Sequence, residues 1–159
     1  MARYRRFDVV RTAAPSDSIE GVRLRRAGLR TAMTGMELAL AAPAPGRMGA
    51  WIDGVQDALI VLHEVWTRHV VETEAPGAFL DELVENEPRL SNQTRRLREE
   101  HGQVLSELLA VEDAFARDPV DPEEIRTRLT TVLCDLARHR QRGADLVYEA
   151  YDVDIGGGA

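Results

Sequence analysis

The chain has 159 residues and contains no lysine, since all 20 of its basic residues are arginine. Lysine supplies the amine of Schiff-base chemistry and the phosphate contact of P-loops, so neither chemistry is expected here. Cys134 is the single cysteine, which excludes a disulfide framework and a zinc site built from several thiolates. Aromatic residues make up only 5% of the chain, and no apolar run approaches the roughly 18–20 residues of a membrane-spanning helix.

The remaining composition is typical of one globular domain. Apolar residues account for 44% of the chain and charged residues for 30%, which is too apolar for a disordered protein and too charged for a membrane protein. The formal net charge of −7 argues against a general nucleic-acid binder, which needs a basic surface. The N-terminal residues lack the apolar stretch of a secretory signal. We therefore expect a cytoplasmic protein that binds neither nucleic acid nor a membrane.

Apolar residues recur at helical spacing in four long segments separated by proline-containing breaks. Asp17 and Glu20 form an acidic version of the capping box, and Asp121 before Pro122 is a strong helix start. The pattern predicts long helices over residues 17–42, 48–73, 88–115 and 122–151, with a short helical piece over 78–85. We expect an all-α, up-down-up-down four-helix bundle over residues 16–151, with an arginine-bearing arm at 1–15 and a flexible tail at 152–159.

Three histidines, His69, His101 and His139, fall on the apolar stripes of three different predicted helices. His69 lies 24 residues after Pro45, His101 lies 18 residues before Pro119, and His139 lies 20 residues after Pro119. In an up-down bundle both prolines mark turns at the same end. At about 1.5 Å per residue, the three histidines then lie roughly 27–36 Å from that end. We expect them in one layer of the core, which the first helix passes near residues 20–26.

Inward histidines in one layer have two interpretations. They are either hydrogen-bonded core residues or ligands of a metal ion, because side chains from facing helices are the usual construction of carboxylate–histidine metal sites in bundles. His63 is different, since it lies about 120° around its helix from the apolar stripe, and we expect it at the boundary of the core. Glu99 and Glu100 are interpreted as solvated charges.

The sequence around these histidines resembles the hemerythrin family, the HHE cation-binding domain. The resemblance rests on LREEHGQVLSELL around His101, LARHRQRGADLVYEA around His139 and WTRHVVETEAPGAFLDELV around His69. It covers about residues 17–151. It implies a four-helix bundle whose core holds a non-heme di-iron centre, ligated by histidines and bridging carboxylates. Members of the family bind oxygen, store or sense iron, or respond to peroxide or nitric oxide.

The chain departs from the family pattern in its ligand set. The family places a histidine on the first helix, where this chain has none and instead carries Arg23, Arg25 and Arg26. The family also places a bridging glutamate four residues after a ligand histidine, but this chain has Thr73 after His69 and Gly143 after His139. Both bridging carboxylates are therefore absent, and a cation near the first-helix position repels a metal ion.

The candidate substitutes are carboxylates beside the vacant positions. Glu72 lies three residues after His69 and shares its helix face, and Glu74 can turn inward where the helix unwinds before Pro76. Asp145 and Glu20 are further candidates. We predict a metal site made of His69, His101, His139, Glu72 and Glu74 that binds at most one iron or other transition-metal ion per chain.

Two functions remain open. The first is a hemerythrin-like protein that handles or senses iron, oxygen or a redox signal, with a metal ion and dioxygen or peroxide as its partners. The alternative is a metal-free hemerythrin-like scaffold that acts as an interaction or structural protein. No catalytic motif is present, so we do not expect an enzyme. Trp51 and Trp66 are interpreted as core residues or as anchors of a subunit interface, so a homodimer is also considered.

Overall fold

The computed structural model describes residues 19–152, and side chains from Leu24 to Ala150. The arm expected at residues 1–15, the cap at Asp17 and residues 153–159 of the expected tail lie outside this range. Within it the chain is helical and contains no strand. The elements are α1 (Ile19–Ala41), α2 (Met48–Glu74), α3 (Phe79–Asn86), a short 3-10 helix (Pro88–Leu90), α4 (Ser91–Phe115) and α5 (Pro122–Asp152).

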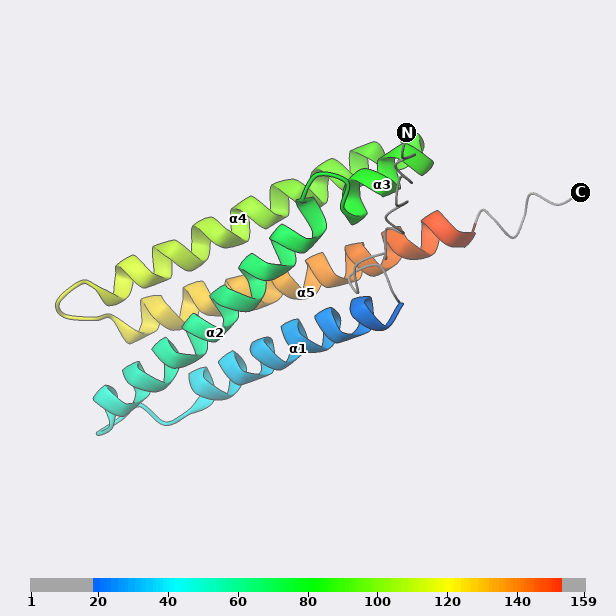
Figure 1. Ribbon diagram of the computed structural model, residues 1–159. Helices are drawn as coiled ribbons and strands as arrows, with labels where there is room; N and C mark the ends of the chain where they lie inside the picture. The colour runs from blue at the N-terminus through cyan, green and yellow to red at the C-terminus, as the bar shows by residue number, and fades with distance from the viewer. Residues whose placement is uncertain (1–18, 153–159) are drawn as a thin grey trace, which may run out of the picture.

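The four long helices pack into a bundle (Figure 1), in which α1 packs on α2, α4 packs on α5, and α2 contacts α4. The connection between α1 and α2 and the connection between α4 and α5 lie at the same end of the bundle (Figure 1). Helix α3 lies at the other end, beside the start of α4. The predicted helix bounds are confirmed to within two residues in the described range, except that the third long helix begins at Ser91, after the 3-10 turn.

The core is built by the apolar stripes that predict the helices. Each long helix buries one residue every three or four positions, as a helix with one side against the core requires. On α2 the buried side chains are Trp51, Val55, Leu59, Leu62 and Trp66. On the remaining long helices the main core contributors are Leu29, Met33, Met36, Leu40, Val104, Leu108, Val111, Ile125, Leu129, Val132 and Leu136. Both tryptophans are thus core residues of this chain.

Local signals fix where the helices begin and end. The Asp121 carboxylate accepts hydrogen bonds from the backbone N–H groups of Glu123 and Glu124, at 3.0 and 3.3 Å, and so caps α5 as expected. Gly46 and Gly77, in the turns before α2 and α3, have φ angles of 74° and 73°, a conformation that favours glycine.

A second apolar cluster closes the end of the bundle that lies beyond the histidines. It joins α3 to α4 and α5 through Leu80, Leu83, Leu90, Leu97 and Leu146. The histidine layer therefore lies between two apolar clusters. Among the described helices, none combines the length and the apolar character needed to cross a membrane.

Candidate metal centre

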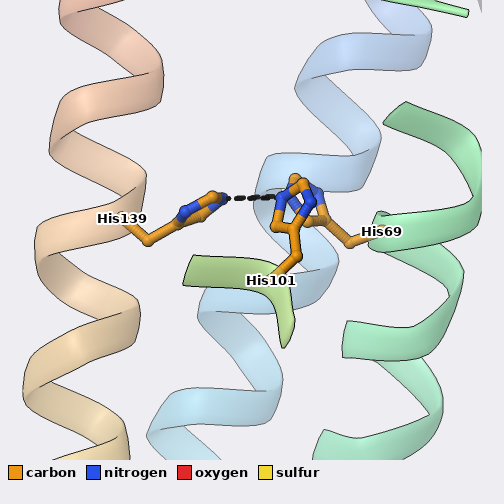
Figure 2. Close-up of side chains that lie close together, drawn as sticks. All are labelled: His69, His101 and His139. Carbon is orange, nitrogen blue, oxygen red and sulfur yellow. Dashed lines mark hydrogen bonds between the residues drawn. The ribbon is translucent and has the colours of Figure 1, made fainter. Parts of the chain in front are cut away.

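The three histidines predicted to share a layer converge in the core (Figure 2). His69 comes from α2, His101 from α4 and His139 from α5, and their rings point toward one another while α1 passes behind them. His101 and His139 are almost fully buried, with 2% and 4% of their surface exposed, and His69 is half-buried. The layering prediction is confirmed, because similar distances of 18 to 24 residues from the same-end turns bring the three side chains to about one height.

The rings approach through their Nε2 atoms. Nε2 of His139 lies 3.2 Å from Nε2 of His69 and 3.2 Å from Nε2 of His101. One ligand atom from each of the three residues lies within 4.8 Å of the other two. Three nitrogen donors from three separate helices therefore lie close enough together to bind one metal ion.

Two carboxylates hold two of the rings from the opposite side. Nδ1 of His101 lies 2.5 Å from a carboxylate oxygen of Glu74, and Nδ1 of His139 lies 2.9 Å from one of Glu100. An ionised carboxylate only accepts hydrogen bonds, so each of these Nδ1 atoms carries the proton and donates it. In the neutral imidazoles, Nε2 of His101 and Nε2 of His139 therefore present lone pairs to the centre.

With this protonation pattern, the Nε2 lone pairs of His101 and His139 face each other with no proton or cation between them. If both Nδ1 atoms carry protons, the 3.2 Å contact between Nε2 of His101 and Nε2 of His139 sets one lone pair against another. A proton on Nε2 of His69 can form a hydrogen bond only with Nε2 of His139, and it leaves the contact between His101 and His139 without a proton. A cation that accepts all three lone pairs satisfies the whole arrangement, and a metal ion is such a cation.

Trp66 closes one side of the cluster. Its ring stacks on His69 at a centroid distance of 5.0 Å and meets the rings of His101 and His139 edge-on at 5.3 and 5.0 Å. Its indole N–H donates to the backbone carbonyl of His101 at 3.4 Å. Trp66 is fully buried, so it keeps water from this side and fixes the ring positions by packing.

Burial keeps the three imidazoles neutral. Burial, together with charge repulsion from His101, His139 and Arg25, lowers the pKa of His69 to about 3. Burial also lowers the pKa of His139 to about 4, against the opposing hydrogen bond to Glu100. The pKa of His101 is lowered for the same reason, against the opposing effect of Glu74. All three rings are neutral at pH 7, the form in which imidazole binds metals.

Neither of the two glutamates predicted as ligands lies beside the three Nε2 atoms. Glu74 lies behind His101, on the Nδ1 side rather than beside the three Nε2 atoms. Glu72 lies next to α1, where its carboxylate is 3.6 Å from Nε of Arg25. One of its carboxylate oxygens is buried and accepts no hydrogen bond. Arg25 thus sits near His69 as the sequence suggests, and its charge opposes a second cation there.

Thr73 and Gly143 stand at the family's bridging positions and supply no carboxylate. The Thr73 hydroxyl donates to the backbone carbonyl of His69 at 2.8 Å, so it is turned toward its own helix. A Cβ atom placed on Gly143 would meet nothing within 4 Å, so this position offers space but no ligand.

Glu100 is the residue that the sequence interpretation misses. The expectation that it is a solvated charge is wrong, because its side chain is only 13% exposed and bonds to both His139 and Arg142. It also lines a surface recess of about 290 Å³ between α4 and α5. Its partners lie on another helix, 39 and 42 residues away. The one available signal is that it immediately precedes His101 on a helix that faces α5.

His63 lies outside the cluster, as expected for a boundary residue. It is half-buried, and its Nδ1 lies 2.6 Å from a carboxylate oxygen of Glu112 on α4. His63 is therefore on the same helix as His69 but outside the cluster, which makes it a suitable control position.

The donor set fits one transition-metal ion and does not fit a di-iron centre. At metal–nitrogen distances of about 2.0–2.1 Å, nitrogen ligands of a tetrahedral ion are roughly 3.3–3.4 Å apart, close to the two observed separations of 3.2 Å. Two iron ions need bridging carboxylates to offset their repulsion. Among the described residues, no carboxylate joins the three nitrogen donors.

Comparisons with protein-family models, curated proteins and solved structures each returned no match. The resemblance to hemerythrins therefore rests on the segments around His69, His101 and His139, and the function is inferred from the geometry of the centre.

Proposed function

We propose that this protein binds one divalent transition-metal ion through Nε2 of His69, His101 and His139. The observation that carries the proposal is the convergence of these atoms, two of which are held as lone-pair donors by Glu74 and Glu100. Histidine ligands of metals usually donate their other N–H to a carboxylate or carbonyl, which fixes the tautomer and makes the ligating nitrogen more basic. Glu74 and Glu100 occupy that role for two of the three rings.

The charges around the centre also suit a divalent ion. Three neutral imidazoles contribute no charge, and the carboxylates of Glu74 and Glu100 bring negative charge behind two of the rings, with Glu100 sharing its charge with Arg142. Glu72 is the candidate fourth ligand, since it follows His69 by about one turn and has an oxygen without a hydrogen bond. Its use as a ligand requires it to leave Arg25.

We assign the bundle to a hemerythrin-like, up-down-up-down architecture with a reduced metal site. The resemblance around the three histidines supports iron as the ion and a role in handling or sensing iron, oxygen or a redox signal. The absence of bridging carboxylates at Thr73 and Gly143 supports one ion per chain rather than two. Imidazole nitrogen equally suits zinc, copper and nickel, so the choice of metal is part of the test.

The alternative is a bundle that has kept the histidine layer without a metal. The location of Arg25 favours it, because this guanidinium already brings positive charge to the neighbourhood of His69. In that case the protein is an interaction or structural scaffold whose histidines serve only the packing of the core.

The experiment that separates these functions is metal titration of the full chain after removal of metals with a chelator. Anaerobic Fe²⁺, Zn²⁺ and Co²⁺ are added in turn, binding is followed by calorimetry, and Co²⁺ is also followed by its visible spectrum. We expect one ion per chain. His101→Ala and His139→Ala abolish binding, whereas His63→Ala leaves it intact because His63 lies outside the centre.

The outcomes are distinct. Binding that survives His101→Ala and His139→Ala would reject the proposed ligands. No binding of any of the three ions by the natural chain would reject the metal function and favour the scaffold. Two ions per chain would show that carboxylates not assigned here act as bridges.

A further inference from the structure

The outer face of α1 carries a stripe of leucine, alanine and threonine that no other part of the described chain covers. Leu24 and Leu38 are 65% and 69% exposed, the largest exposed fractions among the large aliphatic side chains of the described residues. They lie fourteen residues apart on the same face, and the exposed residues between them on that face are small. The complete stripe repeats with a period of seven residues and consists of Leu24, Ala27, Thr31, Thr34, Leu38 and Ala41.

This face is opposite to the one that α1 contributes to the core. The buried residues of the helix are Leu29, Ala32, Met33, Met36 and Leu40. The part of the chain that the structure describes therefore leaves the stripe exposed along most of the helix. A seven-residue repeat of this kind is the pattern by which one helix packs along another.

Two charged residues flank the stripe on one side. Arg30 and Glu37 are exposed, and neither forms an ion pair or a side-chain hydrogen bond with the described residues. They are seven residues apart, which is about 10.5 Å along a helix, so they cannot pair with each other within one chain. On the other side of the stripe lie Gly28 and Gly35, where an added Cβ would meet nothing within 4 Å.

The stripe is complementary to itself in the antiparallel direction. If two copies of α1 pair with Thr31 of one opposite Thr34 of the other, then Ala27 of one copy meets Leu38 of the other. In the same register, Leu24 of one copy meets Ala41 of the other. Each leucine faces an alanine, which is the large-against-small pattern that lets side chains interdigitate. The hydroxyl of Thr31 already donates to the carbonyl of Ala27 at 2.9 Å, so burial leaves it satisfied.

The flanking charges agree with this register. In an antiparallel pair of helices, the residues on one side of the stripe of one copy face the residues on the same side of the stripe of the other copy. Arg30 of each copy therefore lies beside Glu37 of the other, and two ion pairs form. In a parallel, in-register pair, Arg30 would face Gly35 of the other copy, and both charges would stay unpaired. The glycines on the other side allow the two backbones to approach closely.

We propose that this face of α1 is a homodimer interface in which two copies of the chain pair through antiparallel α1 helices. The twofold symmetry uses the same patch on both copies, as an isologous interface does. A single helix pair of about three heptads is small beside the roughly 1,200–2,000 Å² of a standard interface, so we expect a weak dimer with a dissociation constant on the order of a few micromolar. The proposal is independent of metal binding, because the stripe lies on the outer side of α1.

The test is sedimentation equilibrium of the full chain over a range of concentrations. We expect a monomer–dimer equilibrium for the natural protein. Glu37→Arg replaces both intermolecular ion pairs by contacts between arginines and weakens the dimer roughly tenfold or more. The double variant Arg30→Glu with Glu37→Arg restores both pairs with reversed signs and recovers the dimer. Glu64→Arg, the same charge reversal at an exposed position on α2, is the matched control and leaves the equilibrium unchanged.

Three results would overturn the proposal. The first is a protein that stays monomeric up to several hundred micromolar, about a hundredfold above the expected dissociation constant. The second is a dimer that Glu37→Arg and Glu64→Arg affect equally, which would show that α1 is not the interface. A dimer weakened by Glu37→Arg and not recovered by the double variant would reject the antiparallel register. Circular dichroism of each variant verifies that the helices are retained.

Discussion

Acid should unfold the metal-free protein through its histidine cluster, in a pH range where carboxylates contribute little. An unfolded chain binds a proton at each histidine near pH 6.5, whereas burial holds the pKa of His69 at about 3 and that of His139 at about 4. Below pH 6.5 the unfolded state therefore binds more protons than the native state. The free energy of unfolding falls as pH falls, and the full stability is present only above pH 6.5.

The magnitude follows from the lowered pKa values of His69 and His139. Between pH 7 and pH 5, each histidine that stays neutral in the native state and charges in the unfolded state costs about 2 kcal/mol of stability. His69 and His139 together lower the free energy of unfolding by about 4 kcal/mol between pH 7 and pH 5. His101, whose pKa is also lowered, adds to this loss. Typical domains are stable by only about 5–15 kcal/mol, so the effect is large. The lowered pKa values of Asp81 and Glu124 matter at more acidic pH, below their ordinary values.

The assay is urea denaturation of the chelator-treated protein at pH 7, 6 and 5, with the free energy of unfolding obtained by linear extrapolation. His139→Leu removes one titrating group, so the stability of this variant should fall by about 2 kcal/mol less over the same range. A free energy of unfolding that stays constant between pH 7 and pH 5 would show that the buried histidines do not couple stability to pH. So would histidine NMR signals for the cluster that titrate near pH 6.5 in the folded protein.

Three further predictions concern metal affinity, each measured by competition with a chromophoric chelator. Glu100→Gln keeps the size of the side chain but removes its charge, so it should weaken binding roughly tenfold, and an unchanged affinity would show that the carboxylate is not needed. Arg25→Gln should strengthen binding several-fold by removing a cation near His69, and weaker binding would contradict this sign. Gly143→Glu should raise the affinity for the metal ion, because the added carboxylate follows His139 by one turn and its Cβ meets no atom within 4 Å. The same change at exposed Gly54 is the control and should leave the affinity unchanged.

Much of the fold follows from the chain alone, because each helix carries its own signals. The apolar stripe of α2 predicts which of its residues are buried, and Asp121 with Pro122 predicts the first residue of α5. These signals act over one or two turns, so they are visible in the local sequence. The height of the three histidines follows in the same way, since the helix rise is fixed and prolines mark the turns.

The surroundings of the histidines depend on contacts between helices. Glu100 looks like a surface charge beside Glu99, yet its carboxylate reaches His139 on α5. Glu74 is recognised from sequence as a residue of the centre, but its place on the Nδ1 side of His101 depends on how α2 and α4 pack. A periodic pattern shows which face of a helix is buried, and it does not show which residue of a neighbouring helix lies opposite.

The helices, their buried faces and the level at which the histidines lie follow from the amino-acid sequence, because they depend on local propensity and a constant rise per residue. Tertiary structure alone decided the tautomers of His101 and His139, the pairing of Glu72 with Arg25 and the exposure of the α1 stripe. Those features depend on the rotation of each helix about its axis and on its choice of neighbours. Both are set by the packing of whole side-chain surfaces against one another rather than by any short segment.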